Sequence, residues 1–190
     1  MNFSKYVAVV SAVAGLTLAL TGSGCSENTP ATPRVTLNSQ LGPGDEKDVN
    51  DSKKCALITQ PWVVIGENTH PVSDGEQQSG SGVAVSCTVH TEGDGFQVNA
   101  QATLQGQGSI TITGHFTAAG DQPNIRAVFT RGDTGSFKQD DCTVDYSTNK
   151  NMGVAAGRVW GNIRCPHATY DAQSRTCLGT GEFRFENCGQ

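Results

Sequence analysis

Strict alternation of apolar and polar residues between glycine-containing turns most constrains what this 190-residue chain can fold into. Three successive runs alternate in this way, at residues 83–90, 96–104 and 110–116. Because a β-strand points successive side chains to opposite faces, each run predicts a strand with one buried face and one solvated face. The turns at 92–95 and 106–108 would join these strands into an antiparallel meander.

Shorter runs of the same kind predict further strands at 62–65, 124–130, 142–146, 155–164 and 181–187. Seven or eight short strands without a long helix indicate an all-β domain. We expect a small, disulfide-stapled antiparallel β-sandwich, with a small β-barrel as the alternative.

The seven cysteines are the next constraint, since an odd thiol is a liability in an oxidising compartment. The six disulfide candidates are Cys55, Cys87, Cys142, Cys165, Cys177 and Cys188. Spacing alone does not fix how six cysteines pair. We favour Cys165 with Cys177, because a compact polar stretch at 166–176 separates them. Zinc is not predicted, since the chain has no Cys-x2-Cys pair.

Residues 1–24 have the three-part layout of a signal peptide. Lys5 precedes the apolar run 6–20, and small residues follow at 21–24. The run is shorter than the roughly 20 residues that a transmembrane helix needs. The segment therefore predicts secretion.

The stretch LTGSGC at residues 20–25 resembles the lipobox of bacterial lipoproteins. Ser23, Gly24 and Cys25 match that pattern, whereas Gly22 stands where the family prefers leucine. The resemblance implies cleavage before Cys25 and lipidation of its sulfur and amine. Ordinary secretory cleavage at the same bond is the alternative. Lipidation at Cys25 would also leave an even set of cysteines for disulfides. The rest of the chain resembles uncharacterised secreted and surface lipoproteins only in its cysteine placement and β-rich texture, which implies no residue role.

Residues 25–54 are polar and lack a sustained apolar period, so we predict a lipidated cysteine followed by a disordered tether, with the all-β domain at 55–190. The chain would then be anchored in the cell envelope, in the outer membrane if the cell has two membranes, with its domain in the periplasm or outside. The formal charge of −5 becomes −6 once the signal and its Lys5 are removed. An acidic surface disfavours nucleic acid, so the expected partners are the membrane, through the anchor, and a protein or a glycan.

The candidate binding face lies on the strand at 155–164. Alternation places Arg158, Trp160 and Arg164 on one side, where an indole between two guanidinium groups suits a sugar ring, an aromatic group or a partner's side chain. In the alternative interpretation a loop covers Trp160, and the two arginines pair across strands with Glu182 and Glu186.

The sequence carries no catalytic signature: G-x-S-x-G, H-E-x-x-H and phosphate-binding glycine loops are all absent. Its four histidines have no metal-ligand spacing, and Arg131-Gly132-Asp133 is interpreted as a turn. We therefore predict a non-catalytic binding or interaction domain without metal or cofactor. A small secreted hydrolase with a loop-assembled site and a structural or antigenic surface protein are the alternatives.

Overall fold

The computed structural model describes residues 30–44, 53–170 and 175–190, most of which lie in β-strands. The strands are β1 (Arg34–Gly42), β2 (Gln60–Ile65), β3 (Val72–Ser73), β4 (Gln77–Gln78), β5 (Ser81–Glu92), β6 (Gly95–Leu104), β7 (Gly108–Phe116), β8 (Gln122–Arg131), β9 (Gly135–Asp145), β10 (Gly153–Ala155), β11 (Arg158–Tyr170) and β12 (Arg175–Glu186). A short 3-10 turn, η2 (Thr148–Lys150), precedes β10.

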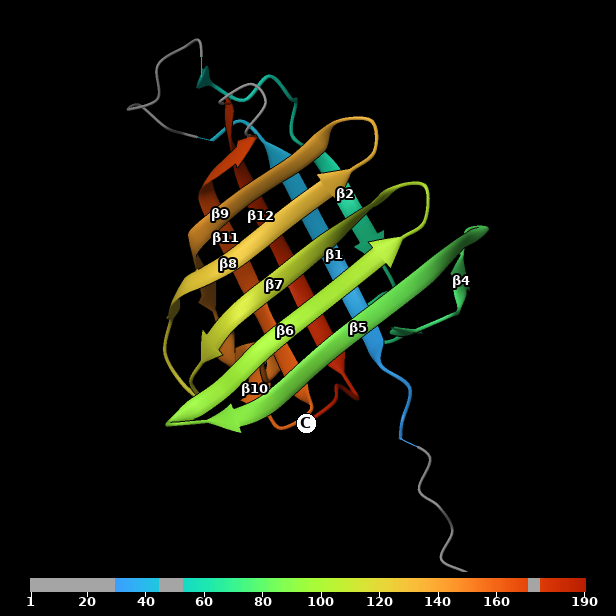
Figure 1. The fold of residues 1–190 in the computed structure, drawn as a ribbon, viewed down its shortest axis with the longest axis vertical. Helices are drawn as coiled ribbons and strands as arrows, with labels where there is room; N and C mark the ends of the chain where they lie inside the picture. The colour runs from blue at the N-terminus through green and yellow to red at the C-terminus, as the bar shows by residue number, and fades with distance from the viewer. Residues whose placement is uncertain (1–29, 45–52, 171–174) are drawn as a thin grey trace, which may run out of the picture.

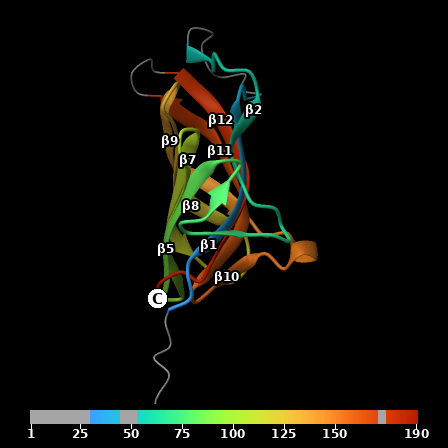
Figure 2. The same ribbon diagram turned by 90° about the vertical axis from the view of Figure 1, so that its right-hand side faces the viewer.

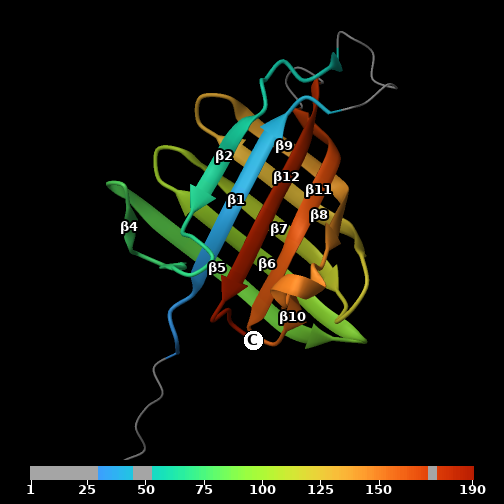
Figure 3. The same ribbon diagram turned by 180° about the vertical axis from the view of Figure 1, so that it is seen from behind.

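The main strands form one continuous sheet in the order β2-β1-β12-β11-β9-β8-β7-β6-β5-β4. The sheet folds over between β9 and β11, so that β5 to β9 make a front layer and β2, β1, β12 and β11 cross behind them (Figure 1, Figure 3). The all-β prediction is confirmed. The domain combines the two layers of a sandwich with the nearly closed ring of a barrel.

The alternation predicted from the sequence determines which side chains fill the space between the layers. Strands lie at every predicted position, except that a turn at 156–157 divides the run predicted as one strand at 155–164 between β10 and β11. The valines, the isoleucines and Leu104 of β5 to β7 face inward and are buried. Phe116 and Phe129 of the front layer and Phe183 and Phe185 of the back layer are fully buried. At about 25 cal/mol per Å² of apolar surface removed from water, these rings are major contributors to the stability of the core.

β1 corrects the prediction of a disordered tether over residues 25–54, which is wrong at 34–42. The strand pairs with β12 along its whole length and with β2 on its other side. Val35, Leu37 and Leu41 point inward and are fully buried. The folded domain therefore includes Arg34 and begins before residue 55.

Ser39 is the reason that the alternation in β1 was not recognised. It occupies an inward position between Leu37 and Leu41 and is fully buried. A buried hydroxyl is costly unless it is hydrogen-bonded. Here the Ser39 hydroxyl donates to the Val63 carbonyl (3.0 Å) and accepts from the Val63 N–H (3.1 Å), at a point where the β1–β2 register shifts.

Three disulfides staple the domain, so the six candidate cysteines are all bonded, but the favoured pair Cys165–Cys177 is wrong. The bonds are Cys55–Cys177, Cys87–Cys188 and Cys142–Cys165. Of the stretch between the two cysteines, residues 166–170 continue β11 and residues 175–176 begin β12, and the register of these strands puts Cys165 opposite Gly179 and Cys177 opposite Ala168. The two cysteines are therefore offset along neighbouring strands, and each bonds to a different element.

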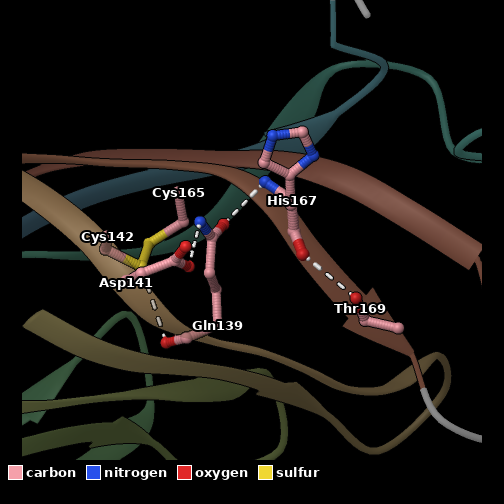
Figure 4. Close-up of a disulfide and its surroundings, with 6 residues drawn as sticks. All are labelled: Gln139, Asp141, Cys142, Cys165, His167 and Thr169. Atoms are coloured by element: carbon pink, nitrogen blue, oxygen red, sulfur yellow. Dashed lines mark hydrogen bonds between the residues drawn. A yellow bond between two sulfur atoms is a disulfide. The ribbon is translucent and has the colours of Figure 1, made fainter. Parts of the chain in front are cut away.

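Cys142–Cys165 lies at the fold between the two layers, where β9 and β11 pair in two separate stretches (Figure 4). Between those stretches, the buried side chain of Gln139 in β9 forms a hydrogen bond to the backbone of β11. Its carbonyl oxygen accepts from the His167 N–H (2.6 Å), and its amide donates to Asp141 (2.8 Å). The side-chain amide replaces ladder hydrogen bonds that the diverging strands cannot make.

The outer edge of β5 is covered by contacts with the edge of β2 and with the C-terminal segment that follows β12. The Gln78 amide beside β5 accepts from the Gly66 N–H (2.6 Å) and donates to the Val64 carbonyl (2.9 Å) at the edge of β2. At the other end of β5, the Val89 N–H donates to the Gly189 carbonyl (2.8 Å), next to the Cys87–Cys188 bond. These contacts cover much of an edge that would otherwise offer unpaired backbone groups to another chain.

The predicted signal peptide at 1–24 and the lipidation site at Cys25 lie outside the described residues. Within the described part of the chain, no helix has the length and apolar character to cross a membrane.

Candidate functional site

The outward side chains of the back layer align in rows across β1, β12 and β11. From one end of the layer to the other, the rows are Arg34-Glu186-Arg158, Thr36-Arg184-Trp160, Asn38-Glu182-Asn162 and Gln40-Thr180-Arg164. We call this surface the back face. Its first two rows are tied together by contacts, whereas its last two rows border a hollow.

Trp160 is half-buried and makes two contacts with side chains of β12. The Arg184 guanidinium carbon lies 4.9 Å from the centre of the indole, a cation–π contact. The indole N–H donates to Glu182 (3.3 Å). The tryptophan therefore stacks on an arginine of the neighbouring strand β12 rather than lying open between the arginines of its own strand.

Glu186 connects the cations of the first two rows. Its buried carboxylate accepts from Arg34 (2.9 Å) and from Arg184 (2.5 Å). Arg184 also donates to the Asn68 carbonyl (3.3 Å), which belongs to the connection between β2 and β3. Figure 2 shows that connection and the η2–β10 segment projecting on the outer side of the back layer.

The predicted face of Arg158, Trp160 and Arg164 does share one side of β11, but the structure does not bring the three side chains into one cluster. Arg158 and Arg164 are six residues apart, roughly 20 Å along a strand. Neither forms an ion pair with a described residue, so their expected pairing with Glu182 and Glu186 is wrong. The arginine on the indole is Arg184 instead.

A hollow of about 350 Å³ lies over the last two rows of the back face. It is lined by Asn38, Gln40, Asp145, Asn162, Ile163, Arg164, Thr180, Gly181 and Glu182. We call it the back-face hollow. Three strands of the back layer contribute its floor, and the end of β9 supplies Asp145.

Part of the wall of the back-face hollow is fixed by contacts within the protein. Lys150 of η2 pairs with Glu182 (2.6 Å), and the Asn162 amide donates to Asp145 (3.0 Å). By contrast, the side chains of Asn38 and Gln40 are exposed and have no hydrogen-bond partner among the described residues, and the same holds for Arg164. Their hydrogen-bonding groups therefore face solvent.

Sequence reasoning found Arg164 but missed Asn38 and Gln40, because both lie in the stretch interpreted as a tether. The available signal was the apolar spacing of Val35, Leu37 and Leu41, which places the residues between them on the opposite side of a strand.

A larger hollow, of about 500 Å³, lies beside the turn at 131–133. There the Arg131 guanidinium stacks on Trp62 (5.1 Å to the ring centre), and one of its terminal nitrogens donates to the Asp133 carboxylate (3.2 Å). Arg131 and Asp133 therefore pair within a structural turn, as predicted. The hydroxyl of Thr134 and the nearby Arg131 hold the pKa of the Asp133 carboxyl below its usual value.

Among the residues that the structure describes, no group of three or more His, Cys, Asp or Glu side chains is arranged to hold a metal ion. Burial raises the pKa of the Tyr146 phenol, whose hydroxyl donates to the Thr117 carbonyl (3.3 Å). Tyr146 thus acts as a neutral packing group next to the end of β9.

In comparisons with known proteins, the chain matches no family model, no curated protein and no solved structure. The functional argument therefore depends on the residues themselves.

Proposed function

We propose that this chain is a lipid-anchored protein of the cell envelope whose β domain binds a ligand, without catalysis, through the back-face hollow. The observation that carries the anchor is the disulfide pattern. Three bonds use six of the seven cysteines, and the remaining one, Cys25, ends the stretch that resembles a lipobox. Disulfides also favour an oxidising compartment.

Two features of the back face support binding rather than catalysis. The carboxylates of its rows are neutralised by neighbours, Glu186 by Arg34 and Arg184, and Glu182 by Lys150. Asp145, at the wall of the back-face hollow, accepts a hydrogen bond from the Asn162 amide. A general base or nucleophile instead needs a side chain poised to act on a substrate. At the back-face hollow, the amide groups of Asn38 and Gln40 and the guanidinium group of Arg164 have no partner among the described residues, and such groups are suited to hydrogen-bonding a ligand.

The anchor is tested by replacing Cys25 with serine and comparing the variant with Ser26→Ala. We expect wild type and Ser26→Ala to incorporate labelled palmitate and to sediment with membranes. The Cys25→Ser chain should take up no label and should leave the membrane fraction. Membrane retention of Cys25→Ser without label would contradict the anchor.

Binding through the back face is tested by placing a photo-crosslinking residue at Gln40 or, as the matched control, at Gln101. Both glutamines are exposed on strands, Gln40 on the back face and Gln101 on the front layer. In intact cells we expect a discrete adduct from position 40 and none from position 101. Adducts from both positions, or from neither, would speak against the back face as the binding surface.

A further inference from the structure

We propose that the back-face hollow binds a segment of an uncharged glycan chain. The inference rests on the proposed binding function and names its ligand class. It follows from the chemistry of the lining side chains, from their balance of charge and from how firmly the wall of the back-face hollow is held.

The groups available at the back-face hollow match sugar hydroxyls. The amides of Asn38 and Gln40 each offer a donor and an acceptor, the Thr180 hydroxyl offers both, and Arg164 offers several donors. A sugar hydroxyl likewise donates and accepts, so a polyhydroxyl ligand can satisfy all four side chains. An apolar ligand would leave these groups desolvated and unpaired, which is costly.

The charges around the back-face hollow cancel. Asp145 and Glu182 contribute two negative charges, and Arg164 of the lining and Lys150 at the rim contribute two positive ones. An anionic ligand would meet both carboxylates, whereas a cationic one would meet Arg164 and Lys150. A neutral ligand avoids electrostatic repulsion from either pair, and this is why we favour an uncharged glycan.

The wall of the back-face hollow is organised before a ligand arrives. Glu182 is held by both Trp160 (3.3 Å) and Lys150 (2.6 Å), and Asn162 is held by Asp145 (3.0 Å). Pre-organised groups lose little conformational freedom on binding. The volume of about 350 Å³ lies at the small end of the range for ligand sites, roughly 300–1,000 Å³. It suits a short stretch of a chain that continues over the sheet on either side.

The two outer faces offer a matched pair of variants for the test. Asn38→Ala with Gln40→Ala removes two exposed amides from β1 on the back face, and Asn99→Ala with Gln101→Ala removes the same two groups from β6 on the front face. The full-length protein, extracted in a detergent without sugar groups, is screened against neutral tetrasaccharides of glucose, xylose, mannose and N-acetylglucosamine. Uronic-acid tetrasaccharides provide the anionic comparison. Affinities are then measured by calorimetry, and folding is checked by thermal melting.

We expect at least one neutral tetrasaccharide to bind, with affinity falling at least tenfold in the β1 double variant and less than twofold in the β6 double variant. Equal loss in both variants, stronger binding of the uronic-acid series, or no binding by any neutral tetrasaccharide would overturn the glycan inference. If glycans fail while the crosslinker at position 40 still yields its discrete adduct, the proposed function stands with another ligand. If both fail, the proposed function fails as well.

Discussion

On the outer face of the front layer, neutral groups predominate, whereas the outer face of the back layer carries a connected set of charges. The outward residues of β6 and β7 are all uncharged, and Glu92 at the end of β5 is the one outward Asp, Glu, Lys or Arg among the described residues of these three strands. The other exposed charges of the front layer lie on β8 and β9, where Arg126 pairs with Asp140 and where Lys138 and Asp141 are also exposed. On the back layer, by contrast, Glu186 and Arg184 join two rows of the sheet.

The difference shows that alternation determines which side chains point outward, but not whether those side chains are exposed to water or covered by other segments. Both layers follow the same period of two. The back layer differs because the connection after β2 and the η2–β10 segment reach over it, which lowers the exposure of its first rows (Figure 2). Contacts with these segments make a half-buried network on the outer face of the back layer. The outer face of β6 and β7 has no such cover from the described residues and is in contact with water.

The largest expected difference in the free energy of unfolding is between two variants, each of which breaks an ion pair on one of the two layers. Glu186→Ala leaves Arg34 and Arg184 without their buried carboxylate, and we expect a loss of about 2–3 kcal/mol, below the value for a fully buried pair because Arg34 is partly exposed. Asp140→Ala on the front face should cost less than about 0.5 kcal/mol, since both partners are exposed. Urea unfolding of each variant gives the two values. Equal losses would remove the distinction between the faces.

Truncation of Trp160 is expected to have the next largest effect. Trp160→Ala removes the stack on Arg184 and the hydrogen bond to Glu182, and should cost about 2 kcal/mol, less than a fully buried tryptophan because the ring is half-buried. Thr113→Ala, an outward position on the front layer, is the control and should change stability by less than about 0.5 kcal/mol. Thermal melts compare the two variants directly. An unchanged melting temperature for Trp160→Ala would mean that the indole is not part of the network.

Lys150→Ala should have the smallest effect on stability. Its ammonium pairs with Glu182 (2.6 Å), but almost half of the lysine side chain is exposed, so we expect a loss of about 0.5 kcal/mol that shrinks as salt is added. The variant sharpens the comparison because it leaves Trp160 and Arg184 in place. Denaturant midpoints of Lys150→Ala and the wild type, measured at low and high salt, test this expectation. A loss of stability that does not depend on salt would indicate packing rather than charge.

The front meander could be predicted from the sequence because each of its strands pairs with its neighbour in the chain. The inward positions of Phe183 and Phe185 were equally accessible, since alternation is a local property. β1 could not be predicted in this way, because Ser39 interrupts its apolar period and because its partner β12 lies at the far end of the chain. Long-range pairing of this kind leaves little local signal.

The cysteine pairing and the back-face hollow were missed for related reasons. Cys142 meets Cys165 only through the register of β9 against β11, and spacing in the chain does not encode that register. The back-face hollow combines Asn38 with Arg164, more than a hundred residues later. Trp160 was placed correctly on the outward side of β11, but its partner Arg184 depends on the alignment of two strands.

The position of β1 has a mechanical consequence. With Cys25 as the proposed anchor, only the eight residues 26–33 separate the lipid from Arg34, and an extended chain of that length reaches at most about 30 Å. Any pull between membrane and ligand then enters the fold at the start of a strand that is hydrogen-bonded to β12 on one side and β2 on the other. A force along that strand loads many bonds at once in shear instead of unzipping them singly. The short linker and the doubly bonded strand would together let the domain bear tension between the proposed anchor and the proposed ligand.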